Sequence, residues 1–449
     1  MSDSLWRHRD FMVLWSGRTL SEVGDAVSML AIPLLAVTVL DASAVEVGVL
    51  TATRMIAYLF LSLPAGVWVD RMRKRRVMVA CHLVRAGLVA TVAIGAWAGW
   101  VTMAQLWIVA LLSSVCTVLY ETAHQSFLPS VVAGNQLLDA NGKLTTTYSV
   151  SRIAGYGVGS ALVSALGVAR TAGIDALAYV VNAVSLMLLR RPEQPPAVAR
   201  RRNFRRELGA GLSFVFRHPI MPRLVAASAS LNLFSQMIFA LAVLYLVRDL
   251  HLSEHMVGVV LALTTLGGIG GGLVSARLAR LVGTARIIWI APLGLGWTVL
   301  LVPVAQPGWG PIAYTAGMAG LGAVFAIYNA AAVSYRQRVC PPDLLGRMTA
   351  SVRWVIFGVM PVGALTGGLL GSWLGVRPTL WIAAAGVWAS GLLLYFSPLR
   401  RWRDLPDEAG TPDEAGTPDG EQPPPRLPAP HGRSPVDPAG KAMGGVRGG

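Results

Sequence analysis

Long apolar segments separated by short polar connections run along the chain from residue 11 to residue 397. A membrane helix needs about 20 consecutive apolar residues to cross the hydrocarbon layer, and these segments are close to that length. The pattern therefore predicts an all-α membrane protein with twelve transmembrane helices. We expect the helices at residues 11–40, 45–69, 77–97, 102–123, 145–167 and 172–189, and then at 224–247, 255–280, 285–304, 311–335, 350–374 and 378–397.

A polar, arginine-rich stretch divides the twelve segments into six and six. We predict an N-terminal six-helix bundle (1–189), a basic cytoplasmic linker (190–222) and a C-terminal six-helix bundle (223–402). Within the linker, residues 204–216 could form a short amphipathic helix on the anionic membrane surface, and a solvated connector is the alternative. Residues 403–449 contain the near-repeat PDEAGTPDEAGTPDG and no apolar periodicity, so we expect a disordered cytoplasmic tail and infer no function for it.

Basic residues crowd into every second connection and toward both ends of the chain. The densest cluster lies at 71–76, whereas the alternate connections hold few basic residues, chiefly Arg170, Arg248 and Arg377. Because Lys and Arg stay on the cytoplasmic side during insertion, both termini are expected in the cytoplasm and the chain in the cell membrane. Two ends on one side require an even number of spans, which agrees with twelve.

Composition supports a membrane protein and excludes several other classes. Of the residues, 54% are hydrophobic and 14% are charged, whereas soluble proteins have about 25% charged residues. The net charge of +15 suggests nucleic acid, but the basic residues lie between apolar runs, so no nucleic-acid partner is expected. Cys81, Cys116 and Cys340 are scattered, which favours packing over metal or disulfide chemistry. No motif for a metalloprotease, serine hydrolase or ATP-binding loop stands in a plausible context, so we expect no enzyme, no cofactor and no metal.

Three charged residues lie inside the first predicted helix. Arg18, Glu22 and Asp25 are spaced four and three residues apart, so they share one helix face, about 10, 16 and 21 Å deep. Charges at that depth are costly and must line a water-filled cavity or pair with neighbours, such as Arg54 or Arg152.

Two interpretations of this stripe remain open. The residues could form a buried ion-pair network that fixes the helices, or one carboxylate could take up and release a proton during transport. Asp25 is the favoured proton carrier, because no basic residue lies one turn away on its own helix and desolvation favours the neutral form of a carboxylate.

Other polar residues complete the predicted site. Glu121 and Arg353 lie closer to the cytoplasmic surface, which favours a gating or structural role. Across from the stripe, the second half offers possible cavity residues: Asn232, Gln236 and Asn329.

Glycines recur at helix-packing spacing in the fifth and eleventh predicted helices. They are Gly155 and Gly159 in the fifth, and Gly363, Gly367 and Gly371 in the eleventh. Glycines four residues apart let helix backbones approach closely in a bilayer. They are either ordinary packing positions or the surfaces on which two bundles rock.

The connection between the second and third helices reads GVWVDRMRKRR at residues 66–76. Gly66 would permit close helix approach, Asp70 could accept hydrogen bonds from backbone amides at a neighbouring helix N-terminus, and the basic run could pair with carboxylates or lipid phosphates. Topology alone would explain the basic run but not Gly66 and Asp70 at this spacing.

This segment resembles the signature of the major facilitator superfamily. The resemblance covers residues 1–400 and implies two pseudo-symmetric six-helix bundles that transport a small molecule by alternating access. It also implies a cytoplasmic latch, which we place on a group of six residues: Gly66, Asp70, Arg71, Arg73, Lys74 and Arg75.

Four further segments are similar to a bacterial efflux branch that includes the enterobactin exporter and macrolide-efflux proteins. They are RDFMVLWSGRTLSEVGDAVSMLAIP (9–33), YETAHQSFLPSVV (120–132), LLDANGKL (137–144) and RQRVCPPDLLGRMTAS (336–351). The resemblance implies an antiporter that exchanges protons for a small amphipathic compound, such as an antibiotic, a siderophore or a metabolite. We expect the protein to be a monomer. The alternative is an uncoupled facilitator or a lipid-translocating carrier of the same fold.

Overall fold

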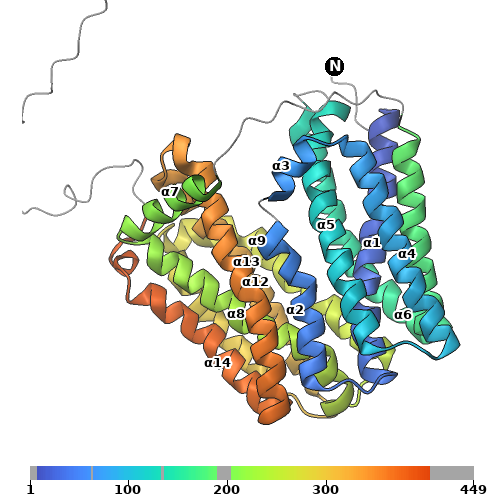
Figure 1. Ribbon diagram of the computed structural model, residues 1–449. Helices are drawn as coiled ribbons and strands as arrows, with labels where there is room; N and C mark the ends of the chain where they lie inside the picture. Colours follow the sequence, from blue (N-terminus) through green and yellow to red (C-terminus); the bar gives the residue numbers. More distant parts are fainter. Residues whose placement is uncertain (1–7, 62–63, 133–135, 190–203, 405–449) are drawn as a thin grey trace, which may run out of the picture. The chain divides into compact units, whose positions relative to one another are not determined.

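The computed structural model describes residues 8–61, 64–132, 136–189 and 204–404, and the regular structure within these ranges is helical (Figure 1). The helices before residue 190 are α1 (Arg9–Thr38), α2 (Ala44–Leu61), α3 (Pro64–Asp70), α4 (Lys74–Ala98), α5 (Met103–Val131) and α6 (Leu137–Met187). After residue 203 come α7 (Phe204–Arg217), α8 (Met221–Leu244), α9 (Glu254–Val282), α10 (Ile287–Ile290), α11 (Leu301–Val304), α12 (Gly310–Val339), α13 (Pro342–Trp373) and α14 (Val376–Tyr395).

The described ranges contain 11 helices that are long and apolar enough to cross a membrane, and one of them holds two predicted spans. Helix α6 is 51 residues long and contains Gly167 at φ 80° and ψ 163°, a conformation that is not helical and that side chains other than hydrogen strongly disfavour. The glycine divides α6 into the fifth and sixth predicted segments. The twelve-helix prediction is therefore confirmed.

The predicted segment 285–304 is continuous but irregular. Between α10 and α11 the chain passes through a π-helical turn (Ala291–Leu295) and a 3-10 turn (Gly296–Leu300). Pro292 and Pro303 lie in this stretch, and proline lacks the N–H that a regular α-helix would use. The loss of regular α-helical bonding therefore follows from the sequence.

We name the two ends of the helical bundle by the connections that lie there. The proximal end carries the start of α1 and the connection 71–73, and the distal end carries the connection 39–43. Four exposed tryptophans lie at or beside distal helix ends: Trp97, Trp100, Trp309 and Trp373. Tryptophan collects where a bilayer meets water, so these residues mark a membrane interface at the distal end.

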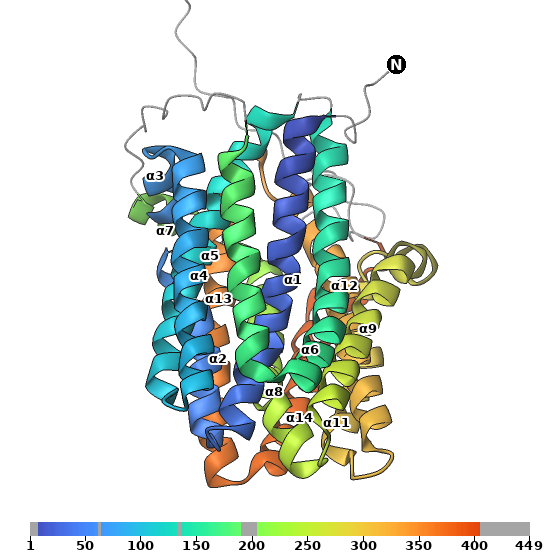
Figure 2. The same ribbon diagram turned by 90° about the vertical axis from the view of Figure 1, so that its right-hand side faces the viewer.

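Glycines let the helices before residue 190 pack closely. Figure 2 shows α1 between the two stretches of α6, and many α1 residues contact α6. Gly155 and Gly159 of α6 face Ala26 and Val27 of α1, and a Cβ at Gly159 would lie 3.2 Å from the Cα of Val27. A larger residue at either position would separate the two helices.

The glycines of α13 have the same geometry against α8. Gly363 faces Leu233, Gly367 faces Met237, and Gly371 faces both Leu241 of α8 and Ala44 of α2. A Cβ at Gly367 would lie 2.8 Å from the Cα of Met237. The five predicted packing glycines thus all lie against a neighbouring helix.

Helices from the two halves of the sequence meet toward the distal end. Gly48 of α2 lies against Gly368 of α13, and a Cβ on Gly48 would lie 2.8 Å from the Cα of Gly368. Gly258 of α9 likewise packs on Ser160 of α6. A salt bridge joins Arg248 Nη2 to Asp41 Oδ1 at 2.5 Å.

The amphipathic helix predicted at 204–216 forms as α7, although residues 190–203 of the linker lie outside the described residues. Val215 is buried in the core. His218 Nδ1 accepts hydrogen bonds from the backbone N–H groups of Ile220 and Met221 at the start of α8. Partial burial lowers the pKa of His218.

The first two residues of the predicted tail, 403–404, contact the rest of the fold. The carbonyl of Arg403 accepts a hydrogen bond from Ala285 N at 3.1 Å, and Asp404 Oδ1 accepts one from Thr284 N at 2.9 Å. These contacts hold 403–404 against the connection between α9 and α10. Residues 405–449 lie outside the described residues.

Candidate functional site

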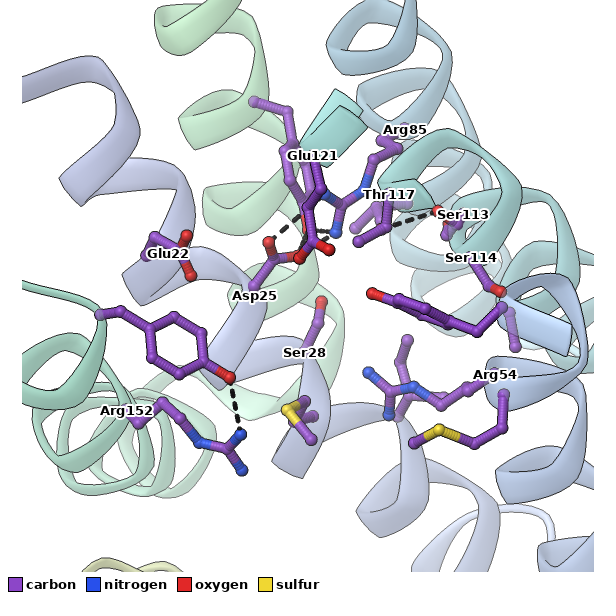
Figure 3. Close-up of a pocket in the computed structure, with 18 of the residues that line it drawn as sticks. Glu22, Asp25, Ser28, Arg54, Arg85, Ser113, Ser114, Thr117, Glu121 and Arg152 are labelled. Atoms are coloured by element: carbon purple, nitrogen blue, oxygen red, sulfur yellow. Dashed lines mark hydrogen bonds and ion pairs between the residues drawn. The ribbon is translucent and has the colours of Figure 1, made fainter. Parts of the chain in front are cut away.

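A cavity of about 260 Å³ lies between α1, α2, α4, α5 and α6, with two side chains from α13 (Figure 3). Residues midway along α1 line it, so the cavity lies near the middle of the membrane spans. It combines ionisable groups with apolar ones. The ionisable side chains of its lining are Glu22, Asp25, Arg54, Arg85, Glu121 and Arg152, together with the tyrosines Tyr58, Tyr148 and Tyr179.

Asp25 is paired with an arginine that was not among its predicted partners. Arg85 of α4 donates to both carboxylate oxygens, with Nη1 3.3 Å from Oδ2, and Tyr179 of α6 donates to Oδ1. The partners predicted for the stripe, Arg54 and Arg152, make no ion pair with Asp25. Arg85 is buried, at 6% exposed, whereas the Asp25 side chain is 32% exposed, and the pair links three helices.

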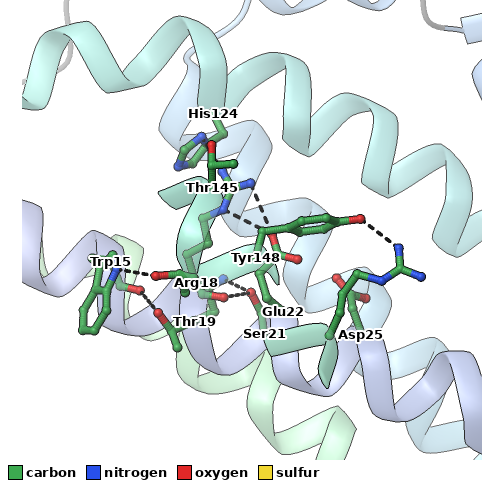
Figure 4. Close-up of polar contacts among 12 residues, drawn as sticks. Trp15, Arg18, Thr19, Ser21, Glu22, Asp25, His124, Thr145 and Tyr148 are labelled. Atoms are coloured by element: carbon green, nitrogen blue, oxygen red, sulfur yellow. Dashed lines mark hydrogen bonds and ion pairs between the residues drawn. The ribbon is translucent and has the colours of Figure 1, made fainter. Parts of the chain in front are cut away.

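Arg18 and Glu22 form the second pair of the stripe. Their side chains are 3.2 Å apart, and Arg18 Nη1 also lies 2.6 Å from Nδ1 of His124 on α5 (Figure 4). Glu22 lines the cavity, whereas Arg18 does not, because its guanidinium turns toward α5. The stripe therefore contains both ion pairs and cavity-facing carboxylates.

A further buried polar cluster lies behind the cavity wall. Asp175 is 1% exposed and accepts a hydrogen bond from Ser28, while its Oδ1 has no hydrogen-bond partner among the described residues. Asn182 bridges Ser21 and His82, at 2.7 and 2.9 Å. The missed residues Arg85 and Asp175 carry a sequence signal, since each is a charge inside an apolar segment.

Two arginines of the cavity lack a carboxylate partner. Arg54 makes no hydrogen bond or ion pair with any described residue. Arg152 bonds only to the hydroxyls of Tyr148 and Tyr156, at 3.0 and 3.2 Å, and these are neutral groups. Figure 3 shows both guanidinium groups directed into the cavity.

The residues predicted to face the cavity from the second half do not line it. Asn232 donates to the backbone carbonyl of Ser228 in its own helix, Gln236 is buried beside Gly363, and Asn329 is exposed. Polar side chains in a membrane helix often donate hydrogen bonds to backbone carbonyls of the preceding turn, as Asn232 does. The second-half residues of the lining are Phe357 and Met360.

The two residues predicted to act at a gate, Glu121 and Arg353, lie in different surroundings. Glu121 lines the cavity, and its carboxylate has no hydrogen bond or ion pair to a described residue. Arg353 is exposed and lies over the ring of Phe357, 5.4 Å from its centroid. Glu121 is thus part of the candidate site, and Arg353 contacts one of its aromatic walls.

The predicted latch is at the proximal end, and part of it lies outside the described side chains. The backbone of Asp70 ends α3, but its side chain is not among those described. No described atom lies within 4 Å of a Cβ position on Gly66, so the close helix approach expected there is not found among the described residues. Arg71 and Arg73 are exposed.

The last two latch residues bond within the first half of the chain. Lys74 Nζ donates to the carbonyl of Ser126 at 3.3 Å, and Arg75 donates to the carbonyl of Met187. These contacts hold the start of α4 against α5 and α6.

The lining combines apolar surface with charged groups. Side chains such as Met29, Met55 and Phe357 offer apolar contact, while unpaired charges offer strong, oriented bonds. Carboxylates bound to arginines can change protonation when the pairs rearrange.

Known proteins share both the sequence pattern and the fold. A family described as "Transmembrane secretion effector" matches residues 4–414. The chain is 25% identical to the multidrug efflux pump Tap of Mycobacterium tuberculosis, covering 89% of this chain and 96% of Tap. It is 23% identical to macrolide efflux protein A of Streptococcus pyogenes, covering 82% and 90%.

Among solved structures, the nucleoside transporter NupG superposes with a TM-score of 0.72 at 14% identity, covering 88% of this chain and 99% of NupG. This likeness confirms the two-bundle fold expected from residues 66–76. The chain belongs to the transmembrane secretion effector family of the major facilitator superfamily, whose members are multi-span membrane transporters.

Proposed function

We propose that this protein is a proton-coupled exporter that moves small amphipathic organic compounds out of the cell by alternating access. The observation that carries the proposal is the mid-membrane cavity, in which the Asp25–Arg85 pair faces apolar walls. Efflux is supported by the names of two relatives, one a multidrug pump and one a macrolide efflux protein.

The proximal end is the cytoplasmic end in this proposal. Support comes from the basic residues of 71–76 and of the ends of α9 and α12, all of which lie at that end. The chain termini and the linker lie inside, and the protein acts as a monomer in the cell membrane.

Contacts near the distal end support a conformation closed to the outside. Gly48 against Gly368 and Arg248 against Asp41 bridge the two halves there, while at the proximal end no described atom lies within 4 Å of a Cβ position on Gly66. Substrate would enter from the cytoplasm, and separation of the distal contacts would release it.

Asp25 is the proposed proton carrier. A proton on Asp25 removes the negative charge that holds Arg85, which weakens the link between α1, α4 and α6. Loss of the proton restores the pair. Such a change in a buried contact between helices can bias one conformation over the other.

The direct test is uptake by inside-out vesicles of a panel of labelled antibiotics and siderophores, with and without a protonophore. Coupled export requires uptake that the protonophore abolishes. Uptake that survives the protonophore would replace the proposal with an uncoupled facilitator. Absence of uptake for every compound would contradict export of these classes.

Asp25→Asn provides a sharper prediction. The amide cannot carry a proton, so we expect loss of pH-gradient-driven uptake, measured in the same vesicles. The matched control is Asp139→Asn, which removes an exposed carboxylate at the start of α6 and should leave uptake unchanged. Wild-type uptake by Asp25→Asn would exclude Asp25 as the carrier.

A further inference from the structure

The ionisable groups of the cavity do not all neutralise one another. Asp25 is paired with Arg85, and Glu22 with Arg18. Among the charged lining residues, this leaves Arg54, Arg152 and Glu121 without an ion-pair partner among the described residues. The unpaired set therefore contains two guanidinium groups and one carboxylate.

An arginine without a counter-charge at this depth in the membrane costs free energy. Arg54 lies near the middle of the 18-residue helix α2, where intramembrane charges are found paired or facing a cavity that serves transport. Its guanidinium has five N–H donors and always carries its charge. Because no described residue accepts from it, the donors remain available to a molecule in the cavity.

Arg152 adds a second positive charge whose position is fixed. The hydroxyls of Tyr148 and Tyr156 hold its guanidinium from two sides, and neither supplies a negative charge. A carboxylate, sulfonate or phosphate is the complement of such a pair, since guanidinium groups bind these anions through parallel hydrogen bonds.

The rest of the lining indicates what the anionic group is attached to. Tyr58 and Phe357 lie with ring centroids 5.7 Å apart, and Met29, Met55 and Met360 line the same cavity. Aromatic and thioether side chains adapt to flat apolar bodies. An inorganic anion would leave these surfaces unused.

We infer that the cavity binds amphipathic organic anions, with the anionic group held by Arg54 and Arg152 and the apolar body against Tyr58, Phe357 and the methionines. The inference rests on the proposed transport function and specifies its substrate class. Glu121, the remaining unpaired group, would repel an anion in the same cavity and so limit its affinity.

Equilibrium binding to the purified full-length protein in nanodiscs tests the inference. The probes are benzoate, 2-naphthoate and 1-pyrenebutyrate, each compared with its own primary amide. The acid and the amide have nearly the same shape but differ in charge. We expect at least one acid to bind about tenfold or more tightly than its amide, as a charge-assisted double hydrogen bond allows.

Substitutions assign that preference to the two arginines. Arg54→Gln and Arg152→Gln should each reduce the acid-over-amide ratio toward one while binding of the amide persists, and Arg54→Lys should keep part of it. Glu121→Gln should raise the ratio. The matched control is Arg170→Gln, which removes an exposed arginine from α6 and should leave the ratio unchanged.

Two results would overturn the inference: no acid of the series binds more tightly than its amide, or the preference survives both arginine substitutions. Binding is measured without a pH gradient, so it is separate from the vesicle test. An acid preference together with protonophore-insensitive uptake would reject proton coupling and retain the anion site. The reverse combination would reject only the anion site.

Discussion

Arg85 and Asp25 form an ion pair, and substitution of either residue is expected to affect the protein. Arg85 is almost fully buried, and its other donor contact is the hydroxyl of Tyr179. Removing one partner of a buried pair strands the other charge and typically costs about 3–5 kcal/mol, whereas removing both is often neutral. The pair can thus serve both structure and transport, the two roles that the sequence left open.

The double variant Asp25→Asn/Arg85→Gln separates these roles. We predict that Arg85→Gln alone lowers the free energy of unfolding, by less than the roughly 3–5 kcal/mol of a fully buried pair, because the stranded Asp25 side chain is 32% exposed. The double variant should regain most of this loss while gradient-driven transport stays absent. Thermal unfolding in detergent and vesicle uptake provide the two measurements.

A double variant as unstable as Arg85→Gln would show that the pair itself, not the stranded charge, holds the helices. A double variant that transports would exclude Asp25 as the proton carrier. Asp139→Asn is again the control for loss of a carboxylate.

At the scale of helices, close glycine contacts determine which surfaces can meet. Gly155 and Gly159 join α1 to α6 within one half, whereas Gly48 and Gly368 join α2 to α13 across the halves. Contacts within a half can persist through a transport cycle. The contact across the halves must open if substrate is to leave at the distal end.

Gly48→Val tests the contact across the halves. A Cβ at Gly48 would lie 2.8 Å from Gly368 Cα and 2.9 Å from Ala364 O, and backbone cannot move aside as a side chain can. Overpacking costs about 1–3 kcal/mol, so the distal-closed conformation should be disfavoured by about 5- to 150-fold. We expect uptake in inside-out vesicles to fall strongly with normal expression.

Gly157→Val is the matched control, since no described atom lies within 4 Å of its Cβ position. Normal uptake by Gly48→Val would mean that the α2–α13 contact is dispensable for transport.

At the scale of the whole molecule, the distribution of basic residues along the sequence predicts the orientation in the membrane. Labelling can test this orientation. Gln306 is exposed at the distal end and Arg280 is exposed at the proximal end. All three native cysteines are buried, so wild-type protein should react poorly with thiol reagents. We predict that a membrane-impermeant maleimide labels Gln306→Cys on intact cells and Arg280→Cys only in inside-out vesicles. The opposite pattern would invert the proposed topology.

The spans were predictable because crossing a bilayer requires long apolar runs, whatever their tertiary partners. The stripe of Arg18, Glu22 and Asp25 was also predictable, since a charge inside such a run needs a reason. The ion-pair partner of Asp25 was not predictable from the sequence. Whether Asp25 meets Arg54, Arg152 or Arg85 depends on how α1, α2, α4 and α6 are rotated against one another, and periodicity in one helix carries no such information.

The cavity lining contributed by the second half was not predictable, for a related reason. Asn232 satisfies its amide on its own helix, and Phe357 and Met360 are indistinguishable in sequence from residues that face lipid.

If the distal end faces the outside, as proposed, the bridge between Arg248 and Asp41 would make the transport cycle respond to the composition of the external medium. Both side chains are accessible to water, at 37% and 94%, so the bridge adds only about 0–1 kcal/mol and is weakened by dissolved salt. It is nevertheless a charge contact that must break when the distal end opens. Salinity outside the cell would then speed that opening without acting on the cavity.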